Sequence, residues 1–424
     1  MAEFAIPYSG NITRVVLDNG IVVLVYENHY VHSVVVQGSL KAGHILEKEW
    51  GRGIASMTAS MLMRGTKNRD FDQIHSDLED IGAQLGFQGG QRSVSFGGKA
   101  LAEDFDTLLD NLQDVLLNPT FPDKEVARYK GELSTALQHK EQDTAYQAQR
   151  AFYQAMYPAD YPMHYQTSGS SETVPTIEPE ELRDFHSQIY GPKGMIIAVV
   201  GAINSAEVIE KLKSRFENWQ NPHQPDLPSY PDLEPLSGRK EVYIPIPGKT
   251  QSNIMLGYRG IYRQHPDYIS ANLGNNILGV FGMMGRVGDI IREELGLAYY
   301  AYTQLEATFG TGYWAMIAGV APENVDLAIE KAEDEFRRIA NEVVSEEELA
   351  DTQSLYTGQL PLRLENSEGI ATNLLAMEIF GLGLDYLVNY KDMIYAINPE
   401  KLQKIMGELV NERGLVIAVS GPPK

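Results

Sequence analysis

The segment "GIASMTASMLMRGT" at residues 53–66 has the pattern of a helix with one small face. Ser56, Ala59 and Ser60 follow the i, i+3, i+4 spacing that places side chains on the same side of a helix. Their neighbours, among them Met57 and Leu62, are typical core residues. The face is either a packing surface of a buried helix or a reactive site that has lost its chemistry. The segment alone leaves both interpretations open.

Histidine could supply metal ligands, but the 9 histidines of the chain are scattered. "HILEK" at residues 44–48 places His44 three residues before Glu47, but Lys48 stands where a second histidine ligand would be needed. "HYVH" at residues 29–32 falls on an expected hairpin turn between two strands. We interpret the first segment as a loop and the second as a turn, and neither predicts a metal site.

Composition and charge limit the class of protein. A chain of 424 residues with 43% hydrophobic and 22% charged residues predicts a folded protein of two or three domains. The formal net charge of −22 repels nucleic acid and anionic membranes and attracts cationic ligands, although solubility alone also explains it. The absence of cysteine excludes disulfides, zinc ribbons and thiol nucleophiles.

The sequence contains no visible targeting signal. The start, "MAEFAIPYSG", lacks the basic and apolar regions of a signal peptide, and no stretch approaches the roughly 20 apolar residues of a membrane span. We therefore expect a soluble protein, without assigning its compartment. A leader removed from the mature protein would remain compatible with this expectation.

The two halves of the chain repeat each other. Residues 177–201, "IEPEELRDFHSQIYGPKGMIIAVVG", align without a gap with residues 397–421, "INPEKLQKIMGELVNERGLVIAVSG". Each segment predicts a proline-started helix, a turn and a buried strand that ends in glycine. Residues 20–40 and 240–260 are likewise both strand–turn–strand patterns. The matching order of elements predicts two α+β domains of one ancestry.

A stiff, extended linker separates the halves at residues 221–238. Its prolines are Pro222, Pro225, Pro228, Pro231 and Pro235. We therefore predict domains at 1–220 and 240–424, joined by the linker at 221–239. Each is expected to be an α/β sandwich, with a mixed, largely antiparallel sheet packed against helices.

The duplicated halves, the proline-rich linker and "GIASMTASMLMRGT" together resemble the M16 zinc peptidases, the family of insulinase and mitochondrial processing peptidase. The resemblance covers nearly the whole chain. In that family, the helix that matches residues 53–66 carries a His-x-x-Glu-His motif. The two histidines lie one turn apart and bind Zn²⁺, and the glutamate polarises the metal-bound water.

The resemblance implies that the zinc site of this chain is degenerate. Ser56 and Ser60 stand at the two histidine positions, and Ala59 stands at the glutamate position. The third ligand of the family, a glutamate farther along the chain, falls near Ala136 or Leu137, and Glu132 lies about one turn too early. We therefore expect no metal and no cofactor in this chain.

The second half keeps a different motif. "IIREELGLAYY" at residues 290–300 resembles the family segment whose arginine and tyrosine bind the substrate backbone and stabilise the oxyanion. The matching residues are Arg292 and Tyr299, with Tyr300 as the alternative tyrosine. A guanidinium and a phenol are suitable donors to a carbonyl oxygen that gains charge. Without the resemblance, an ion pair between Arg292 and Glu293 and a packed tyrosine would explain the same residues.

A glycine-rich segment precedes this motif, with Gly279, Gly282 and Gly285 among its glycines. It lacks the lysine of a P-loop and the glycine spacing of a dinucleotide fingerprint. It resembles the segment with which processing-peptidase-like subunits contact substrate, and a tight packing turn is the alternative.

The resemblance implies a division of labour. Some bacterial members pair one subunit that carries His-x-x-Glu-His and zinc with a second subunit that carries the Arg–Tyr pair. We expect this chain to be the second kind, inactive alone, and to act with its partner on oligopeptides, among which the negative charge would favour basic ones. The competing interpretation is a proteolytically silent structural or peptide-binding subunit.

Overall fold

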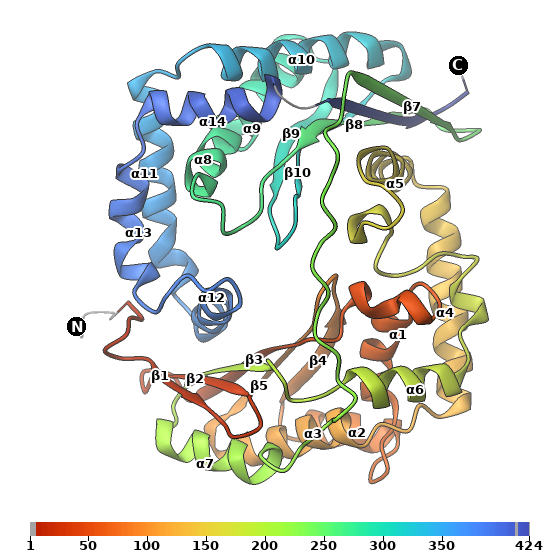
Figure 1. Cartoon of the computed structure of the whole chain (residues 1–424), viewed down its shortest axis with the longest axis vertical. Helices are drawn as coiled ribbons and strands as arrows, with labels where there is room; N and C mark the ends of the chain where they lie inside the picture. The colour runs from red at the N-terminus through yellow and green to blue at the C-terminus, as the bar shows by residue number, and fades with distance from the viewer. Residues whose placement is uncertain (1–5, 412–413, 424) are drawn as a thin grey trace. The chain divides into compact units, whose positions relative to one another are not determined.

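The computed structural model describes residues 6–411 and 414–423, which form two compact units. Unit 1 comprises the described parts of Met1–Leu137, Gln166–Ser229 and Pro361–Val388. Unit 2 comprises those of Gln138–Tyr165, Tyr230–Leu360 and Asn389–Lys424. Each unit thus takes residues from both halves of the chain (Figure 1), whereas the predicted boundaries follow the order of the sequence.

Unit 1 contains a six-stranded mixed sheet with the order β1-β2-β6-β3-β5-β4. β2 and β6 are parallel, and the other neighbouring strands are antiparallel. The strands are β1 (Thr13–Val16), β2 (Val22–Glu27), β3 (Ser33–Leu40), β4 (Gln84–Gly89), β5 (Val94–Leu101) and β6 (Ile196–Gly201).

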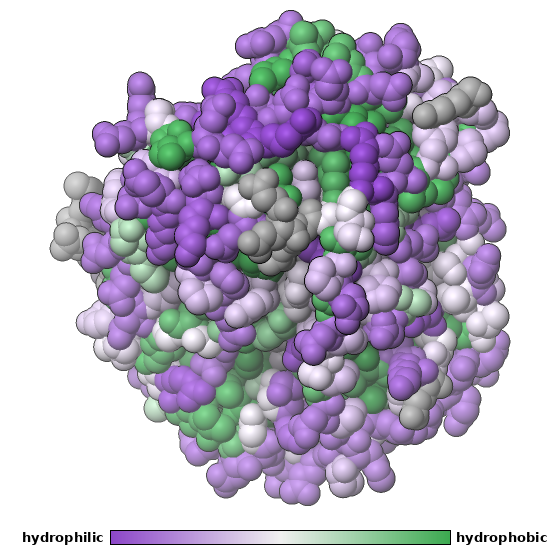
Figure 2. Space-filling view, turned by 45° about the horizontal axis from the view of Figure 1, so that its top comes forward, coloured by the Kyte–Doolittle hydropathy of each residue, from purple (hydrophilic) through white to green (hydrophobic). Residues whose placement is uncertain are grey.

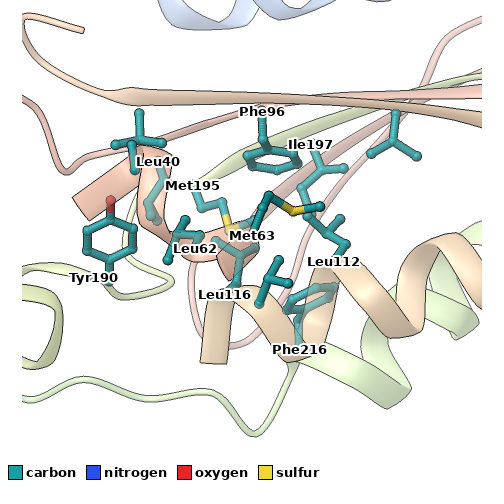
Figure 3. Close-up of a cluster of buried hydrophobic side chains, with 14 of the residues drawn as sticks. Leu40, Leu62, Met63, Phe96, Leu112, Leu116, Tyr190, Met195, Ile197 and Phe216 are labelled. Atoms are coloured by element: carbon teal, nitrogen blue, oxygen red, sulfur yellow. The ribbon is translucent and has the colours of Figure 1, made fainter. Parts of the chain in front are cut away.

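The main core of unit 1 lies between this sheet and its helices. Figure 3 shows Phe96 and Ile197 of the sheet near Leu112 and Leu116 of α3 and Phe216 of α7, and all five are at most 2% exposed. The helices of the unit are α1 (Ile54–Met61), α2 (Phe71–Glu79), α3 (Phe105–Leu117), the larger part of α4 (Asp123–Glu141), α6 (Pro179–Ile189), α7 (Ser205–Phe216) and α12 (Ser367–Ile379). Short 3-10 helices are η1 (His44–Glu49), η2 (Leu62–Arg64), η3 (Ala102–Asp104) and η5 (Val174–Thr176).

Unit 2 contains a five-stranded sheet with the order β7-β11-β8-β10-β9. The strands are β7 (Arg239–Pro245), β8 (Ser252–Arg259), β9 (Ala298–Glu306), β10 (Tyr313–Val320) and β11 (Leu415–Gly421). β7 and β11 are parallel, and the other neighbours are antiparallel. The order matches that of unit 1 without β1, which confirms the predicted class of two similar mixed sheets packed with helices.

The helices of unit 2 include the second proline-started helix of the repeat. They are α5 (Thr144–Met156), α8 (Tyr268–Gly279), α9 (Phe281–Gly288), α10 (Val325–Asn341), most of α11 (Glu346–Arg363), part of α13 (Tyr386–Tyr395) and α14 (Pro399–Asn411). A π-helix, η6 (Asp289–Glu294), and the 3-10 helices η4 (Pro162–His164) and η7 (Pro322–Asn324) complete the unit. No helix or strand lies between Phe216 and Arg239, where the linker was expected.

The expected hairpin at residues 29–32 is wrong. β2 and β3 are consecutive in the chain, but β6 lies between them and pairs with both. In unit 2, β11 separates β7 from β8 in the same way. The last strand of each half therefore occupies the interior of its sheet, which the local strand–turn–strand pattern does not reveal.

Two helices cover the sheet that the other half of the chain builds. α5 packs on β8 and β11, and α12 packs on β3 and β6. Two ion pairs join α12 to its sheet: Arg14 makes a bidentate pair with Glu378, and Lys99 Nζ lies 2.6 Å from Glu368.

Hydrophilic residues cover most of the face in Figure 2, with smaller hydrophobic patches between them. Within the described residues, no helix combines the length and apolar character that a bilayer crossing requires.

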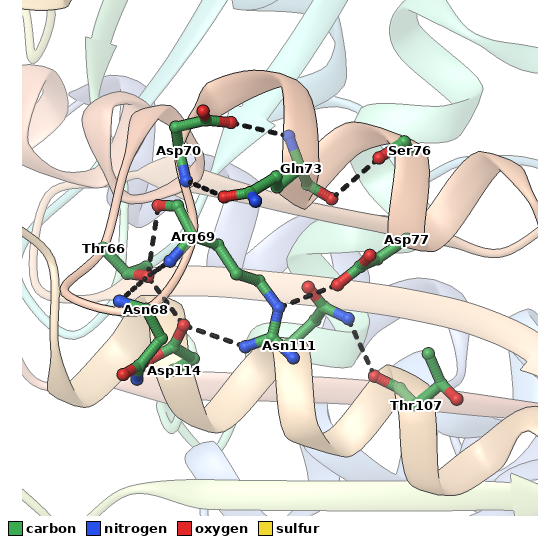
Figure 4. A network of polar contacts seen from close by, with 10 residues as sticks. All are labelled: Thr66, Asn68, Arg69, Asp70, Gln73, Ser76, Asp77, Thr107, Asn111 and Asp114. Atoms are coloured by element: carbon green, nitrogen blue, oxygen red, sulfur yellow. Dashed lines mark hydrogen bonds and ion pairs between the residues drawn. The ribbon is translucent and has the colours of Figure 1, made fainter.

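A buried carboxylate organises the loop that follows α1 (Figure 4). Asp114 of α3 accepts hydrogen bonds from Thr66 Oγ1 and Asn68 Nδ2, both at 2.6 Å. Arg69 Nη1 lies 2.9 Å from the same carboxylate, and its Nε lies 2.8 Å from Asp77. The side chain of Asp114 is 5% exposed, so these bonds replace its hydration and fix the loop to α3.

We expect Asp114→Asn to destabilise the chain in a pH-dependent way. Burial raises the pKa of Asp114, but the hydrogen bonds, first from Thr66 and Asn68, outweigh it, so the pKa is lowered. Because the pKa of Asp114 is lower in the folded chain than in the unfolded chain, its carboxylate stabilises the fold at pH values above the unfolded pKa of about 3.9. This contribution is lost as the pH falls through the folded pKa. The free energy of unfolding should fall by about 2 kcal/mol at neutral pH, and the difference should shrink in acid.

Urea unfolding at a series of pH values measures this difference. The control is Asp80→Asn at an exposed position, which should change the free energy of unfolding by less than about 0.5 kcal/mol. A difference for Asp114→Asn that stays constant from neutral to acid pH would contradict the assigned role.

Candidate functional site

The small face of α1 packs closely against β4. Ala59 is fully buried, and Ser60 Oγ donates a hydrogen bond to the Ser56 carbonyl at 3.0 Å, within the helix. A Cβ atom on Gly89 of β4 would lie 2.5 Å from Ser56 Cα, so only glycine allows this approach. The small residues of this face therefore have a packing role.

The residues at the degenerate zinc site do not fit the metal. Zinc sites are built from imidazole, thiolate or carboxylate groups, whereas this face offers two hydroxyls and a methyl group. On α4, Ala136 is exposed and Leu137 is buried, and Glu132 is paired with Arg64 and Arg128 at 3.0 Å each. Across the described residues, no group of three His, Asp or Glu side chains is arranged to hold a metal ion.

The "HILEK" segment, expected to be a loop, forms the 3-10 helix η1 and supports α1. The carboxylate of Glu47 accepts the backbone N–H groups of Gly53, at 3.1 Å, and Ala55, at 2.8 Å, at the start of α1. His44 Nδ1 lies 3.0 Å from the same carboxylate, and both side chains are at most 1% exposed. Glu47 therefore satisfies N–H groups that the helix itself leaves without partners.

In unit 2, Arg292 lies on the π-helix η6, just before a tight turn into β9. The N–H of Leu297 donates to the Ile291 carbonyl at 2.9 Å, and Gly296 adopts a φ of +61° that favours glycine. Ile291 is fully buried and anchors the segment. Single π-helical turns are rare and are frequently found at functional sites.

The side chain of Arg292 is 29% exposed, and its Nε lies 3.4 Å from Glu293 Oε1. This contact is the ion pair that sequence reasoning offered as the ordinary alternative. An exposed pair of this kind contributes little free energy. It therefore leaves the guanidinium available to a ligand.

Tyr299 is the unpaired residue of a β-bulge. Tyr300 pairs with Gly319 of β10, but Val320 pairs with Ala298, so one additional residue lies between them on β9. The Tyr299 side chain is 85% exposed, which is unusual for a large aromatic residue. Bulges often re-aim a side chain beside an active site, and this one turns the phenol toward solvent.

The neighbouring tyrosine has a different environment. The Tyr300 hydroxyl accepts a hydrogen bond from Asn253 Nδ2, and Thr144 Oγ1 donates to Asn253 Oδ1 at 2.6 Å. Burial raises the pKa of Tyr300 above its ordinary value. Of the two candidate tyrosines, Tyr299 is the one whose ring faces solvent.

The glycine-rich segment is mostly helical, and the three glycines differ. A Cβ on Gly279 would lie 2.3 Å from the Thr303 backbone nitrogen, and one on Gly285 would lie 2.6 Å from the Ile277 carbonyl oxygen. Close packing therefore explains glycine at both positions without a ligand. Gly282 is exposed, with a φ of +59° and open space around its Cα. The expected contact with substrate is thus geometrically open to Gly282.

Comparison with known proteins assigns the family. A model described as "Insulinase (Peptidase family M16)" matches residues 22–164, and one described as "Peptidase M16 inactive domain" matches residues 176–356. Together they cover most of the chain. The chain belongs to peptidase family M16.

Similar proteins span almost the whole chain at low identity. An uncharacterized zinc protease of Rickettsia bellii is 23% identical over 391 residues, which cover 92% of this chain and 90% of that protein. The human mitochondrial-processing peptidase subunit beta is 21% identical over 395 residues, covering 91% of this chain and 79% of that protein. These relatives place the chain among peptidase-like proteins.

Solved structures show the same fold. A peptidase M16 inactive domain from Pseudomonas fluorescens has a TM-score of 0.89 at 23% identity and covers 98% of this chain and 99% of its own. A protease from Helicobacter pylori has a TM-score of 0.89 at 19% identity, with coverage of 97% and 99%.

Sequence reasoning missed the two features that position these residues. The cap by Glu47 acts across six and eight residues, outside the local spacing of capping motifs, so no sequence signal identifies it. The bulge at Tyr299 depends on the register between β9 and β10, which the sequence of β9 alone does not define.

We expect Glu47→Ala to destabilise unit 1 by about 3–5 kcal/mol, because it removes the buried acceptor of two backbone N–H groups at the start of α1 and the carboxylate beside His44. The measurement is urea unfolding followed by circular dichroism. Glu103→Gln, at an exposed position with the same charge change, is the control. If Glu47→Ala and Glu103→Gln unfold at the same denaturant concentration, the cap is not important for stability.

Proposed function

We propose that this chain is the subunit without metal in a heterodimeric zinc metallopeptidase that cleaves oligopeptides. Its partner would be an M16 subunit with His-x-x-Glu-His, which would hold the zinc. The observation that carries the proposal is the display of Tyr299 on a bulge one short turn after Arg292, in a chain whose α1 has no metal ligand. Membership of family M16 supports it.

The chemistry assigned to this chain is binding and charge stabilisation. The guanidinium of Arg292 and the phenol of Tyr299 would donate hydrogen bonds to the substrate carbonyl oxygen as it gains negative charge. Such donors act mainly in the transition state, because the oxyanion accepts stronger hydrogen bonds than the ground-state carbonyl. When bound by the partner, zinc would supply the activated water.

The expected substrates are extended, unstructured peptides. The net charge of −22 would favour peptides with basic side chains through long-range attraction, which salt would weaken. Gly282 would lie close to the peptide backbone, because it has no side chain to prevent the approach.

A second candidate function is a proteolytically silent structural or peptide-binding subunit. It is favoured by the contact of Arg292 with Glu293 and by the description of the second matching family model as an inactive domain. In that case the Arg–Tyr pair would be a remnant. The two candidates differ in whether the partner needs Arg292 for activity.

We expect Arg292→Ala to lower the kcat of the heterodimer by about 10²–10³, because it removes one oxyanion donor. Tyr299→Phe, which removes only the hydroxyl, should reduce kcat with little change in KM. The measurement is cleavage of a long unstructured peptide by the His-x-x-Glu-His partner, alone and with this chain. This chain alone should be nearly inactive.

Two matched controls make the same substitutions at other positions and should keep the fold. Arg337→Ala on α10 and Tyr262→Phe alter exposed side chains of the same unit that have no assigned role in the site. Both should retain full activity. If the partner cleaves equally well without this chain, or if Arg292→Ala behaves like Arg337→Ala, the structural or peptide-binding function is the better one.

Zinc should be confined to the partner. We expect the purified chain to contain no stoichiometric zinc by elemental analysis, and a chelator to leave its melting temperature unchanged, because α1 offers no ligand group. The same chelator should abolish cleavage by the heterodimer. Stoichiometric zinc in this chain alone would contradict the proposed division of labour.

A further inference from the structure

A cavity of about 480 Å³ lies within unit 2, beside the strand that carries Tyr299. Three tyrosines line it: Tyr300 and Tyr302 come from β9, and Tyr146 comes from α5. The centroids of the Tyr300 and Tyr302 rings lie 6.0 Å apart, and the planes of the two rings are inclined by 39°. Its volume is within the range of small-ligand pockets, and it is open to solvent at Tyr302, which is 36% exposed.

The deeper wall of the cavity is apolar. Ile254 and Met255 of β8 are at most 2% exposed, and Ile317 of β10 and Ala148 of α5 complete this wall. A charged side chain placed against it would lose hydration without gaining a partner from this wall. An apolar side chain would gain free energy from the same burial.

Several polar groups of the cavity already have hydrogen-bond partners. Asn253 accepts from Thr144 and donates to Tyr300, and Asp143 accepts the N–H of Tyr146 at 2.8 Å. Lys140 Nζ lies 5.6 Å from the centre of the Tyr146 ring. With one lysine and one aspartate, the lining has no net charge. This neutral balance favours neither an acidic nor a basic ligand.

An extended peptide can reach this cavity along β9. β9 is the edge strand of its sheet, and no other strand in the described residues pairs with its outer edge. Tyr300, Tyr302 and Gln304 alternate along the strand and line the cavity together. A peptide that adds to the edge would place every second side chain on this face, beside the bulge at Tyr299.

We propose that the cavity is a specificity pocket that takes one large aromatic or apolar side chain of an extended peptide laid along β9. This inference rests on the proposed function, because a peptide ligand follows from it. It adds a local selection for an aromatic side chain to the long-range attraction of basic peptides. The two effects act on different positions of the same peptide.

Binding to the full chain without a partner tests the pocket. The probe is a fluorescein-labelled unstructured peptide with one central tryptophan, compared with the same peptide carrying alanine or arginine there. We expect the alanine and arginine peptides to bind about tenfold more weakly, because burial of one aromatic side chain is lost. Equal affinity of the three peptides would overturn the proposal.

Filling the cavity provides the matched variant. Ala145 is exposed on α5 and lines the pocket, so Ala145→Trp should remove the preference for tryptophan without removing a buried contact. Ala396→Trp, at an exposed position away from the cavity, should leave the preference unchanged. Loss of the preference in both variants, or in neither, would overturn the assigned location.

Crosslinking locates the bound side chain directly. A peptide with p-benzoylphenylalanine in place of the tryptophan should label Met255 or Tyr302, and excess tryptophan peptide should suppress the labelling. Competed labelling confined to other residues would overturn the proposal.

The outcomes separate this inference from the proposed function. Arg292→Ala should abolish activation of the partner but keep the tryptophan preference. If the preference is present and no partner is activated, the pocket stands and the peptidase role fails. If the partner is activated without any preference, the peptidase role stands and the pocket is wrong.

Discussion

The fold depends on the placement of the last strand of each half inside its sheet. β6 pairs in parallel with β2 and antiparallel with β3, and β11 does the same with β7 and β8. β11 is buried along its whole length, and β6 is buried except at its first residue, and each strand joins two earlier strands that do not pair with each other. Two parallel strands also require a long connection between them. The helices within this connection build the faces on which the site residues lie.

The two segments that the sequence analysis singled out differ in their local structure. At α1, the small residues allow β4 to approach at Gly89, and the helix is held by Glu47. Restoring long ligand side chains there would have to displace this packing. At η6 and β9, the local geometry is irregular: a π-turn, a glycine with positive φ and a bulge. Packing alone does not require an 85% exposed tyrosine.

Sequence predicted what depends on local pattern and on side-chain identity. The repeat, the two proline-started helices and the missing ligands at Ser56, Ala59 and Ser60 could all be read directly. The features that depend on tertiary pairing could not be predicted from the sequence. The strand–turn–strand pattern at residues 20–40 is the same whether or not β6 enters between the strands, and the exchange of α5 and α12 leaves no local signal. The role of Glu47 was missed for the same reason.

Tyr299 and Tyr300 illustrate how register gives adjacent residues of the same type different environments. In a regular strand, neighbours point to opposite faces, and both can be packed. The extra residue at the bulge frees Tyr299 from the pairing with β10, while Tyr300 stays bonded to Asn253 at the wall of the aromatic cavity. One irregularity in the ladder therefore places a hydrogen-bond donor and an apolar pocket next to each other on one edge strand. A peptide bound there would meet groups for its backbone and for one of its side chains together.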